Sequence, residues 1–538
     1  MQLFRRKPIN AIEAVLDENQ KLKRTLGPIE LTSLGIGAVI GAGIFATTGT
    51  AAAGGLHHAG AGPALVISFI LTAMVCSFCA LCYAEFASMI PISGSAYTYS
   101  YATLGELVAW IMGWNLIIEY AIGNVAVAVS WAGYFRQLCA GFDLHIPLWM
   151  CIDLRTAHAL HEIAAQWGSK VLGLTSGVSA SDVPNIIAQL QATPAQFGLT
   201  PDSMAAVVDK LTQAAGILQA PVFFGFQLAF NLPAVGIVTL ITILLVIGIK
   251  ESARVNNIMV AIKLFVVIGF IVVGAFYVKP EHWIPFAPNG WNGIWTGAAL
   301  VFFAYIGFDA ISTTAEEARN PKRDLPIGMI ASLIVSTVLY IGVALVLTGV
   351  VKYDRLGVAE PLALAMKIIH LDWAAGIISF GAVASMTAVL LVFQLGQPRI
   401  LFSMARDGLL PKSFAAVHPR FKTPHVTTII TGVFVAFFAG FVDINEAVEL
   451  TNIGTLFAFM TVCAGILVLR KKEPHLERPF RTPWVPVIPI LGIVSCAYLM
   501  AALPAVTWIR FGIWLLIGFV IYFGYGYRHS RLHAKPSP

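Results

Sequence analysis

Long apolar runs separated by short polar segments dominate the hydrophobic pattern of this chain. A helix needs about 20 mostly apolar residues to cross the hydrocarbon core of a bilayer. Twelve runs approach or exceed that length, at residues 29–54, 63–88, 105–138, 232–249, 256–278, 293–316, 327–350, 373–403, 425–442, 447–469, 484–504 and 508–527. The pattern predicts an all-α integral membrane protein with about twelve transmembrane helices.

One connection is much longer than the others. Residues 143–231 separate transmembrane helices 1–3, expected over 29–142, from helices 4–12, expected over 232–527. Ser181–Pro184 and Thr200–Asp202 resemble helix starts, so this insert is predicted to hold short amphipathic helices outside the bilayer. We interpret it as a solvated cap, with a docking surface for a protein partner as the alternative.

Composition and charge refine the topology. Hydrophobic residues make up 58% of the chain and charged residues 12%, whereas soluble domains carry about 25% charged residues. With the N-terminal segment 1–28 inside, the inner segments hold 23 of the 34 Lys and Arg residues. The positive-inside rule then places this segment and the tail 528–538 in the cytoplasm. We expect the protein to lie in the inner (plasma) membrane of the cell. The net charge of +6 is a topology signal and indicates no nucleic-acid partner. The first segment lacks an early apolar core, so we expect no cleavable signal peptide.

The cysteines indicate no redox or metal chemistry by themselves. Cys76, Cys79 and Cys82 recur every three residues inside an apolar run, which favours small residues on one helix face over a metal site. Cys139 and Cys151 flank the start of the insert, and a disulfide between them is left open. The runs contain no nucleophile–base pair and no metal-ligand set, so we predict neither an enzyme nor a cofactor.

Glycines concentrate in the first run. Gly35, Gly37, Gly41 and Gly43 each weaken a helix by roughly 1 kcal/mol relative to alanine. A helix break is tolerated in hydrocarbon only where it lines a cavity. Close helix packing through Gly37 and Gly41 is the alternative explanation.

The sixth run carries a matching signal in Phe302–Ala310, where Gly307 stands among aromatic residues beside Asp309. Interrupted helices at corresponding places of two halves indicate an inverted-repeat transporter with its site near the bilayer midplane. The pairing is more specific than either run alone.

A broken helix offers two main-chain poles. The second half of the first run begins with amides near Ala42, Gly43 and Ile44, which favour a carboxylate. The first half ends with carbonyls near Val39 and Ile40, which favour an ammonium group. An α-amino acid carries both groups on one carbon, so one break is suited to hold its two ends.

Two of the ionisable residues within the runs are candidates for function. Charged residues inside a bilayer cost roughly 2.5–3.5 kcal/mol each on insertion scales. Lys263 is suited to proton exchange or to the place of a sodium ion, with snorkelling to the interface as the alternative. Glu119 is either a site residue or a structural partner. Glu85 and Arg399, nearer the inner helix ends, are interpreted as structural.

Taken together, these motifs resemble the amino acid–polyamine–organocation superfamily of permeases, and within it the bacterial relatives of the cationic amino acid transporters. The matching stretches cover nearly the whole chain except the insert: Gly35–Phe45, Cys82–Phe86, Pro91–Tyr99, Phe302–Asp309, Glu316–Pro321, Arg406–Pro411 and Thr451–Leu456. The resemblance implies two inverted five-helix repeats, with discontinuous helices 1 and 6, followed by two further helices.

The resemblance also implies roles for individual residues. It implies a carboxylate grip on the amides near Ala42 and Gly43, and an ammonium grip on the carbonyls of Val39, Phe303 and Ile306. In proton-coupled members a helix 5 lysine replaces the sodium site, and Lys263 falls at that position. Glu119 matches an acidic position near the substrate cavity, and the predicted site is completed by Ile40, Gly41, Ile44 and Ala304.

The chain departs from the family pattern at three places. Ala42 stands where relatives often have Ser or Thr, which removes a hydroxyl contact to the substrate carboxylate. Phe393-Gln394 replaces a more apolar pair, and the insert 143–231 has no counterpart in compact bacterial relatives.

The leading functional hypothesis is proton-coupled uptake of amino acids by alternating access. Its partners are the amino acid, H+ and the lipid bilayer. An ion-independent amino acid exchanger is the second hypothesis. A non-transporting sensor or assembly subunit is the third.

Overall fold

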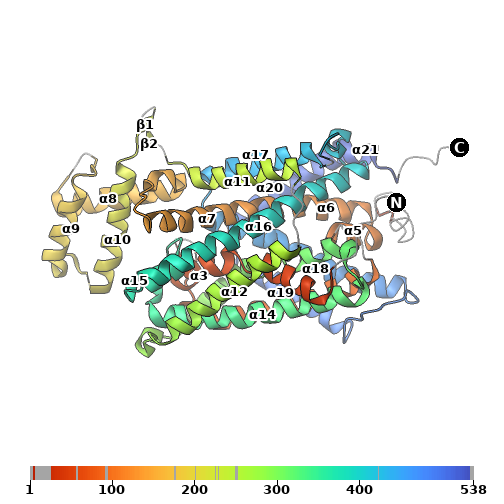
Figure 1. Cartoon of the computed structure of the whole chain (residues 1–538), viewed down its shortest axis with the longest axis horizontal. Coiled ribbons are helices and arrows are strands. Elements are labelled where there is room, and N and C mark those ends of the chain that lie inside the picture. Colours follow the sequence, from red (N-terminus) through yellow and green to blue (C-terminus); the bar gives the residue numbers. More distant parts are fainter. Residues whose placement is uncertain are drawn as a thin grey trace.

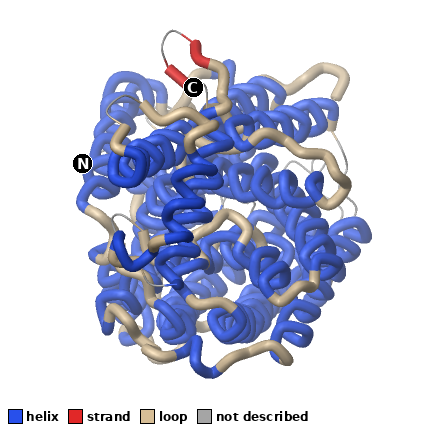
Figure 2. Tube along the Cα trace, turned by 90° about the vertical axis from the view of Figure 1, so that its left-hand side faces the viewer, coloured by secondary structure: helices blue, strands red, loops and turns tan. Residues whose placement is uncertain are grey.

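The computed structural model describes residues 4–6, 26–55, 58–90, 95–174, 177–199, 201–223, 226–227, 229–248, 253–421 and 423–532. Most of the helices run along the long axis of the molecule (Figure 1). Seen from the end (Figure 2), the described chain is helical almost throughout. Its only strands are the two-residue β1 (Val222–Phe223) and β2 (Phe226–Gln227), which pair as an antiparallel hairpin.

The apolar helices of the described chain agree in number with the predicted twelve. Eight spans qualify individually, a ninth is a bent pair of helices, and three shorter apolar helices complete the set within the described residues. The spans are formed by α2 (Pro28–Val39) with α3 (Thr48–Ala53), α4 (Leu65–Met89), α6 (Glu106–Ile117) with α7 (Gly123–Ala140), α11 (Leu232–Ile247), α12 (Ala253–Ala275), α13 (Gly290–Val301), α14 (Pro321–Val350), α16 (Asp372–Arg406), α17 (His425–Phe441), α18 (Ile444–Lys472), α19 (Val487–Ala501) and α20 (Ala505–Ile521) with α21 (Tyr527–His529). The protein is therefore an all-α, multi-pass membrane protein.

Shorter helices mark the two ends of the bundle. Three of them, α8 (Leu154–Leu172), α9 (Val183–Ala192) and α10 (Pro201–Leu218), form the insert and share a small apolar core of their own. They lie at one end of the molecule, whereas α5 (Ser95–Thr103) and α21 lie at the other (Figure 1). At that second end Arg5 Nη1 donates to the Leu532 carbonyl at 3.2 Å, so the described parts of both chain ends lie together.

A buried ion cluster fastens α4 to the segment after α18. Glu85 is fully buried and accepts hydrogen bonds from Arg470 at 2.8 and 2.7 Å, and from the Thr482 amide at 2.8 Å. Arg478 Nε lies 3.3 Å from the same carboxylate. A carboxylate held by this many donors has a structural role, as the sequence predicted for Glu85.

Replacing Glu85 by glutamine is expected to destabilise the protein strongly. The substitution leaves two guanidinium groups facing a neutral amide, and breaking a buried pair by removing one partner costs about 3–5 kcal/mol. Thermal unfolding of the purified protein in detergent measures the effect. Glu162→Gln in the exposed part of α8 is the matched control, and equal transition temperatures for the two variants would contradict the structural role.

The cysteines of α4 meet sulfur atoms of two other spans. Cys79 Sγ lies 3.5 Å from Cys496 Sγ of α19 and 4.0 Å from Cys463 Sγ of α18. All seven thiols are free, so Cys139 and Cys151 are not paired in this structure. Among the described residues, no three His, Cys, Asp or Glu side chains are arranged to hold a metal ion. The thiols fill tight helix contacts, as small residues do.

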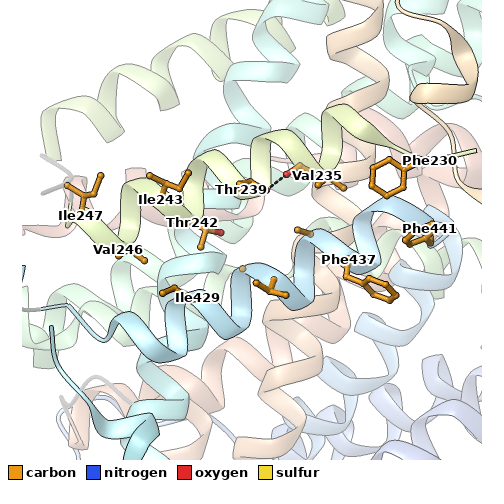
Figure 3. A pocket seen from close by; sticks show the side chains of 13 residues that line it. Phe230, Val235, Thr239, Thr242, Ile243, Val246, Ile247, Ile429, Phe437 and Phe441 are labelled. Atoms are coloured by element: carbon orange, nitrogen blue, oxygen red, sulfur yellow. Dashed lines mark hydrogen bonds between the residues drawn. The ribbon is translucent and has the colours of Figure 1, made fainter.

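An apolar cavity of about 550 Å³ opens between α11 and α17. Figure 3 shows aliphatic side chains such as Ile243 and Ile247 along α11, with Phe230, Phe437 and Phe441 at one end. Thr239 and Thr242 also line it, and their hydroxyls donate to carbonyls of their own helix. This lining suits the lipid-facing side of a membrane protein, and the polar residues of the candidate site lie elsewhere.

Candidate functional site

The first span is interrupted where its glycines predict a break. Helix α2 ends at Val39, and Ile40 has an extended backbone, with φ −78° and ψ 98°. A π-helical turn, Gly43–Thr47, leads into α3, and the two halves are bent by 43°. The chain therefore changes direction inside the bilayer at the glycine-rich stretch.

The sixth span is interrupted as well. Helix α13 gives way to a tight 3-10 turn, Phe302–Tyr305, and Ile306 is extended with φ −63° and ψ 132°. Gly307 follows with φ +120°, a backbone conformation that side chains with a Cβ rarely adopt. The chain then continues as a 3-10 helix, Phe308–Glu317, so both interruptions predicted from the sequence are present.

The two breaks lie against each other. A Cβ added to Gly43 would overlap the main chain of Ala304, so the backbones are in contact there. The Tyr340 hydroxyl of α14 lies 2.9 Å from the Val39 carbonyl and 2.6 Å from the Ala304 carbonyl. One hydroxyl thus bridges the ends of both interrupted helices. Residues 35–49 and 297–312 are buried, so the structure is closed around this junction.

Lys263 reaches the first break from α12. Its side chain is fully buried, and Nζ donates to the carbonyls of Gly37 at 2.6 Å and Ile40 at 3.0 Å. The Ser385 hydroxyl of α16 donates to the same Ile40 carbonyl at 2.9 Å. The ammonium group therefore sits at the negative end of α2, and the alternative that Lys263 snorkels to the interface is wrong.

Protein donors already occupy several of the predicted main-chain contacts. The Val39 carbonyl shares the single hydroxyl proton of Tyr340 with the Ala304 carbonyl, and the Ile40 carbonyl accepts from Lys263 and Ser385. The Phe303 carbonyl accepts from the Ile306 amide at 3.3 Å, and the Ile44 amide donates to the Gly41 carbonyl at 3.2 Å. A carbonyl oxygen has two lone pairs, so these carbonyls keep one acceptor site each at most. In this closed arrangement Ile44 is therefore a weaker candidate than the two residues before it, Ala42 and Gly43.

A pair of acidic residues lies near the second break. Glu119 stands on a π-helical turn, Ile118–Ile122, between α6 and α7, and is 2% exposed. Asp309, two residues after Gly307, is 1% exposed, and the two carboxyl groups interact electrostatically. Within the described chain, Glu119 Oε2 and both carboxyl oxygens of Asp309 have no hydrogen-bond partner. This arrangement leaves acceptors ready for a proton or a cationic group.

Three buried tyrosines lie near these acids. Tyr83, Tyr99 and Tyr120 are buried, and their hydroxyls also have no hydrogen-bond partner among the described residues. Each interacts electrostatically with Asp309. Asp309 was apparent in the sixth apolar run, but neither it nor these tyrosines were predicted as site residues. The available signal was an acid and several phenols at buried positions of apolar runs.

Phe393 and Gln394, the unusual pair on α16, make different kinds of contact. Gln394 Nε2 donates to Thr242 Oγ1 at 2.5 Å, and its Oε1 accepts from Asn124 at 3.3 Å, so this amide joins α16 to α11 and α7. The Phe393 ring lies 5.4 Å from the Tyr120 ring, beside the acid pair. Only Phe393 of the two is therefore near the candidate site.

Comparisons with known proteins agree with this arrangement. The sequence profile of the family described as amino acid permease matches residues 26–523. A protein of Bacillus subtilis named methylthioribose transporter is 44% identical over 531 residues, 99% of each chain. A branched-chain amino acid permease of the same organism is 45% identical over 532 residues, again 99% of each chain. Arabidopsis thaliana cationic amino acid transporter 4, vacuolar, is 33% identical over 88% of this chain and 68% of its own.

Proposed function

Since this chain belongs to the amino acid permease family, we propose that it takes up amino acids across the cytoplasmic membrane by proton-coupled symport with alternating access. The amino acid would bind where the two interrupted helices meet. Its carboxylate would face the amides at Ala42 and Gly43, and its ammonium group the carbonyls of Val39 and Ile306. The excess of Lys and Arg in the segments assigned to the inner side supports cytoplasmic chain ends and an extracytoplasmic insert.

The observation that carries the coupling proposal is the contact of Lys263 with the first break. A protonated amine donates to the Gly37 and Ile40 carbonyls and holds α2 against α12. A neutral amine keeps fewer donors and loses its attraction to the negative helix end. Loss of the proton would therefore loosen α2 at the position where the substrate binds. This is the property a proton-coupled carrier needs, since protonation and opening must be linked.

The acid pair indicates which substrate side chains the proposed site favours. Glu119 and Asp309 have unpaired oxygens beside the second break, so a positively charged or hydrogen-bond-donating side chain would be stabilised there. The Phe393 ring next to Tyr120 offers an apolar surface for the same side chain. We therefore expect amino acids whose side chains combine an apolar stem with a donor, alongside branched apolar ones.

Uptake into proteoliposomes tests the coupling directly. With the interior buffered at pH 7.5 and the exterior at pH 5.5, without sodium, labelled amino acid is expected to accumulate, and a protonophore is expected to abolish the accumulation. Methylthioribose is tested beside the labelled amino acids, because one relative is named for its transport. Accumulation that needs sodium and ignores the pH gradient would contradict the proton coupling.

The same vesicles separate the other hypotheses. Counterflow at equal pH, with no gradient-driven accumulation, would favour an exchanger. Binding in a thermal-shift panel without any flux would favour a sensor, since a ligand raises apparent stability whether or not it is transported.

A further inference from the structure

A second cavity, which is lined by polar residues, lies at the end of the bundle that carries the insert. Its volume is about 230 Å³. Ala46 and Thr50, on the second half of the broken first span, form part of its wall, and Asp153 and Gln213 of the insert form another part. The cavity therefore lies between the insert and the helix that forms the first break. It is smaller than the ~300 Å³ lower range of pockets for drug-sized ligands, so it suits a small molecule.

Charged groups from four different elements of the fold gather in this cavity. Arg136 of α7 pairs with Glu360 at 3.0 Å. Asp153 caps α8 by accepting the Thr156 amide at 2.8 Å, and Asp443 caps α18 by accepting the Asn445 amide at 2.9 Å. All four charged side chains line the cavity, which leaves more negative than positive charge.

The two capping aspartates repel each other. Burial raises the pKa of Asp153, and the nearby negative charge of Asp443 raises it further. Thr156 bridges the pair, with Oγ1 3.5 Å from Asp443. A positively charged ligand group between the two carboxylates would relieve this repulsion.

A buried asparagine also lines this cavity. Asn231 is fully buried, and its Oδ1 accepts the Ala234 amide at 3.2 Å at the start of α11. Asn231 is one of the residues that line the cavity, and its buried Nδ2 has no hydrogen-bond partner among the residues that the structure describes. A buried donor without an acceptor is costly, so a ligand that brings an acceptor would be stabilised here.

We propose that this cavity is an outer binding site for an amino acid zwitterion. The carboxylate would accept from Asn231 Nδ2 and Arg136, and the ammonium group would lie between Asp153 and Asp443. The inference rests on the proposed function, because the ligand is the transported substrate before it reaches the break. The insert thereby gains a role, since it supplies Asp153 and Thr156.

Ion pairs hold the insert over this site. Arg155 of α8 pairs with Glu446 of α18, and Asp209 of α10 lies 3.5 Å from Arg355. These contacts join two insert helices to two separate outer parts of the bundle. The cavity wall supplied by the insert is therefore fastened to the wall supplied by the transmembrane helices.

Transport kinetics and binding stoichiometry test the outer site. Asp153→Asn and Asn231→Asp keep the oxygen that caps each helix and change only the group offered to the ligand. With tritiated L-leucine and L-arginine as probes, each variant is expected to raise KM about tenfold, the effect of losing one charge-assisted hydrogen bond, with Vmax within about twofold. Equilibrium binding is expected to fall from two molecules per chain to one. The matched control is Asp182→Asn, a half-buried residue before α9 that does not line the cavity.

The possible failures are distinguishable. No uptake of any amino acid by the wild-type protein would contradict the proposed function. Wild-type uptake, with KM and stoichiometry in both cavity variants equal to those of Asp182→Asn, would overturn the outer site alone. A stoichiometry of one in the wild-type protein would also overturn it.

Discussion

Replacing Lys263 by alanine is expected to reduce proton-driven uptake at least about tenfold. The variant loses the ammonium group that donates to the Gly37 and Ile40 carbonyls. A buried hydrogen bond to a charged group contributes about 1.5–3 kcal/mol, and each 1.4 kcal/mol corresponds to a factor of ten. The linkage between protonation and the position of α2 disappears with the amine, so the gradient no longer drives net transport.

Two measurements make the Lys263 result specific. Initial uptake with an inward proton gradient is compared with counterflow at equal pH, which needs no coupling and is expected to suffer less. Lys279→Ala, at an exposed outer position, is the matched control and should behave like the wild-type protein. Gradient-dependent uptake by Lys263→Ala at the wild-type rate would refute the role assigned to this lysine.

Replacing Gly43 by alanine is expected to abolish both binding and transport. A Cβ at this position overlaps the main chain of Ala304, which cannot rotate away as a side chain would. Overpacking of this kind costs about 1–3 kcal/mol, and here it would push apart the two breaks that are proposed to hold the substrate. The expected result is loss of ligand-induced thermal stabilisation and at least a tenfold fall in uptake.

The matched control for this variant is Gly269→Ala in α12, where no atom lies within 4 Å of the added Cβ. It makes the same chemical change in a membrane-spanning helix and should preserve binding. Normal affinity in Gly43→Ala, with the protein folded by size-exclusion chromatography, would show that the contact of the two breaks does not shape the site.

The features that the sequence predicted correctly are those that a single local stretch of the chain determines. Apolar length alone identifies the spans, because hydrocarbon imposes one helix length on each crossing. The break in the first span follows from the glycines around Gly41, and the break in the sixth span is marked by Gly307, whose φ of +120° requires glycine. Lys263 was identified because a charged residue inside an apolar run needs a partner.

The features that sequence reasoning missed depend on which helices become neighbours. Nothing near Tyr340 in the chain indicates that its hydroxyl joins the ends of two other spans. Glu119 lies in the third span and Asp309 in the sixth, with the insert and two spans between them in sequence, and only the fold brings them together. Gln394 stood out in the sequence only as a departure from the family pattern, and nothing near it in the chain indicates that it donates to Thr242 of α11. Such pairings arise from tertiary contacts that no single segment specifies.

The most direct test of the central claim is an experimental structure of the protein in nanodiscs, saturated with the amino acid that stabilises it most in the thermal-shift panel. We expect the ligand between the two interrupted helices, with its carboxylate against the amides of Ala42 and Gly43 and its amine facing Val39 and Ile306. An amino acid bound only elsewhere, with this junction still closed on itself, would contradict the account.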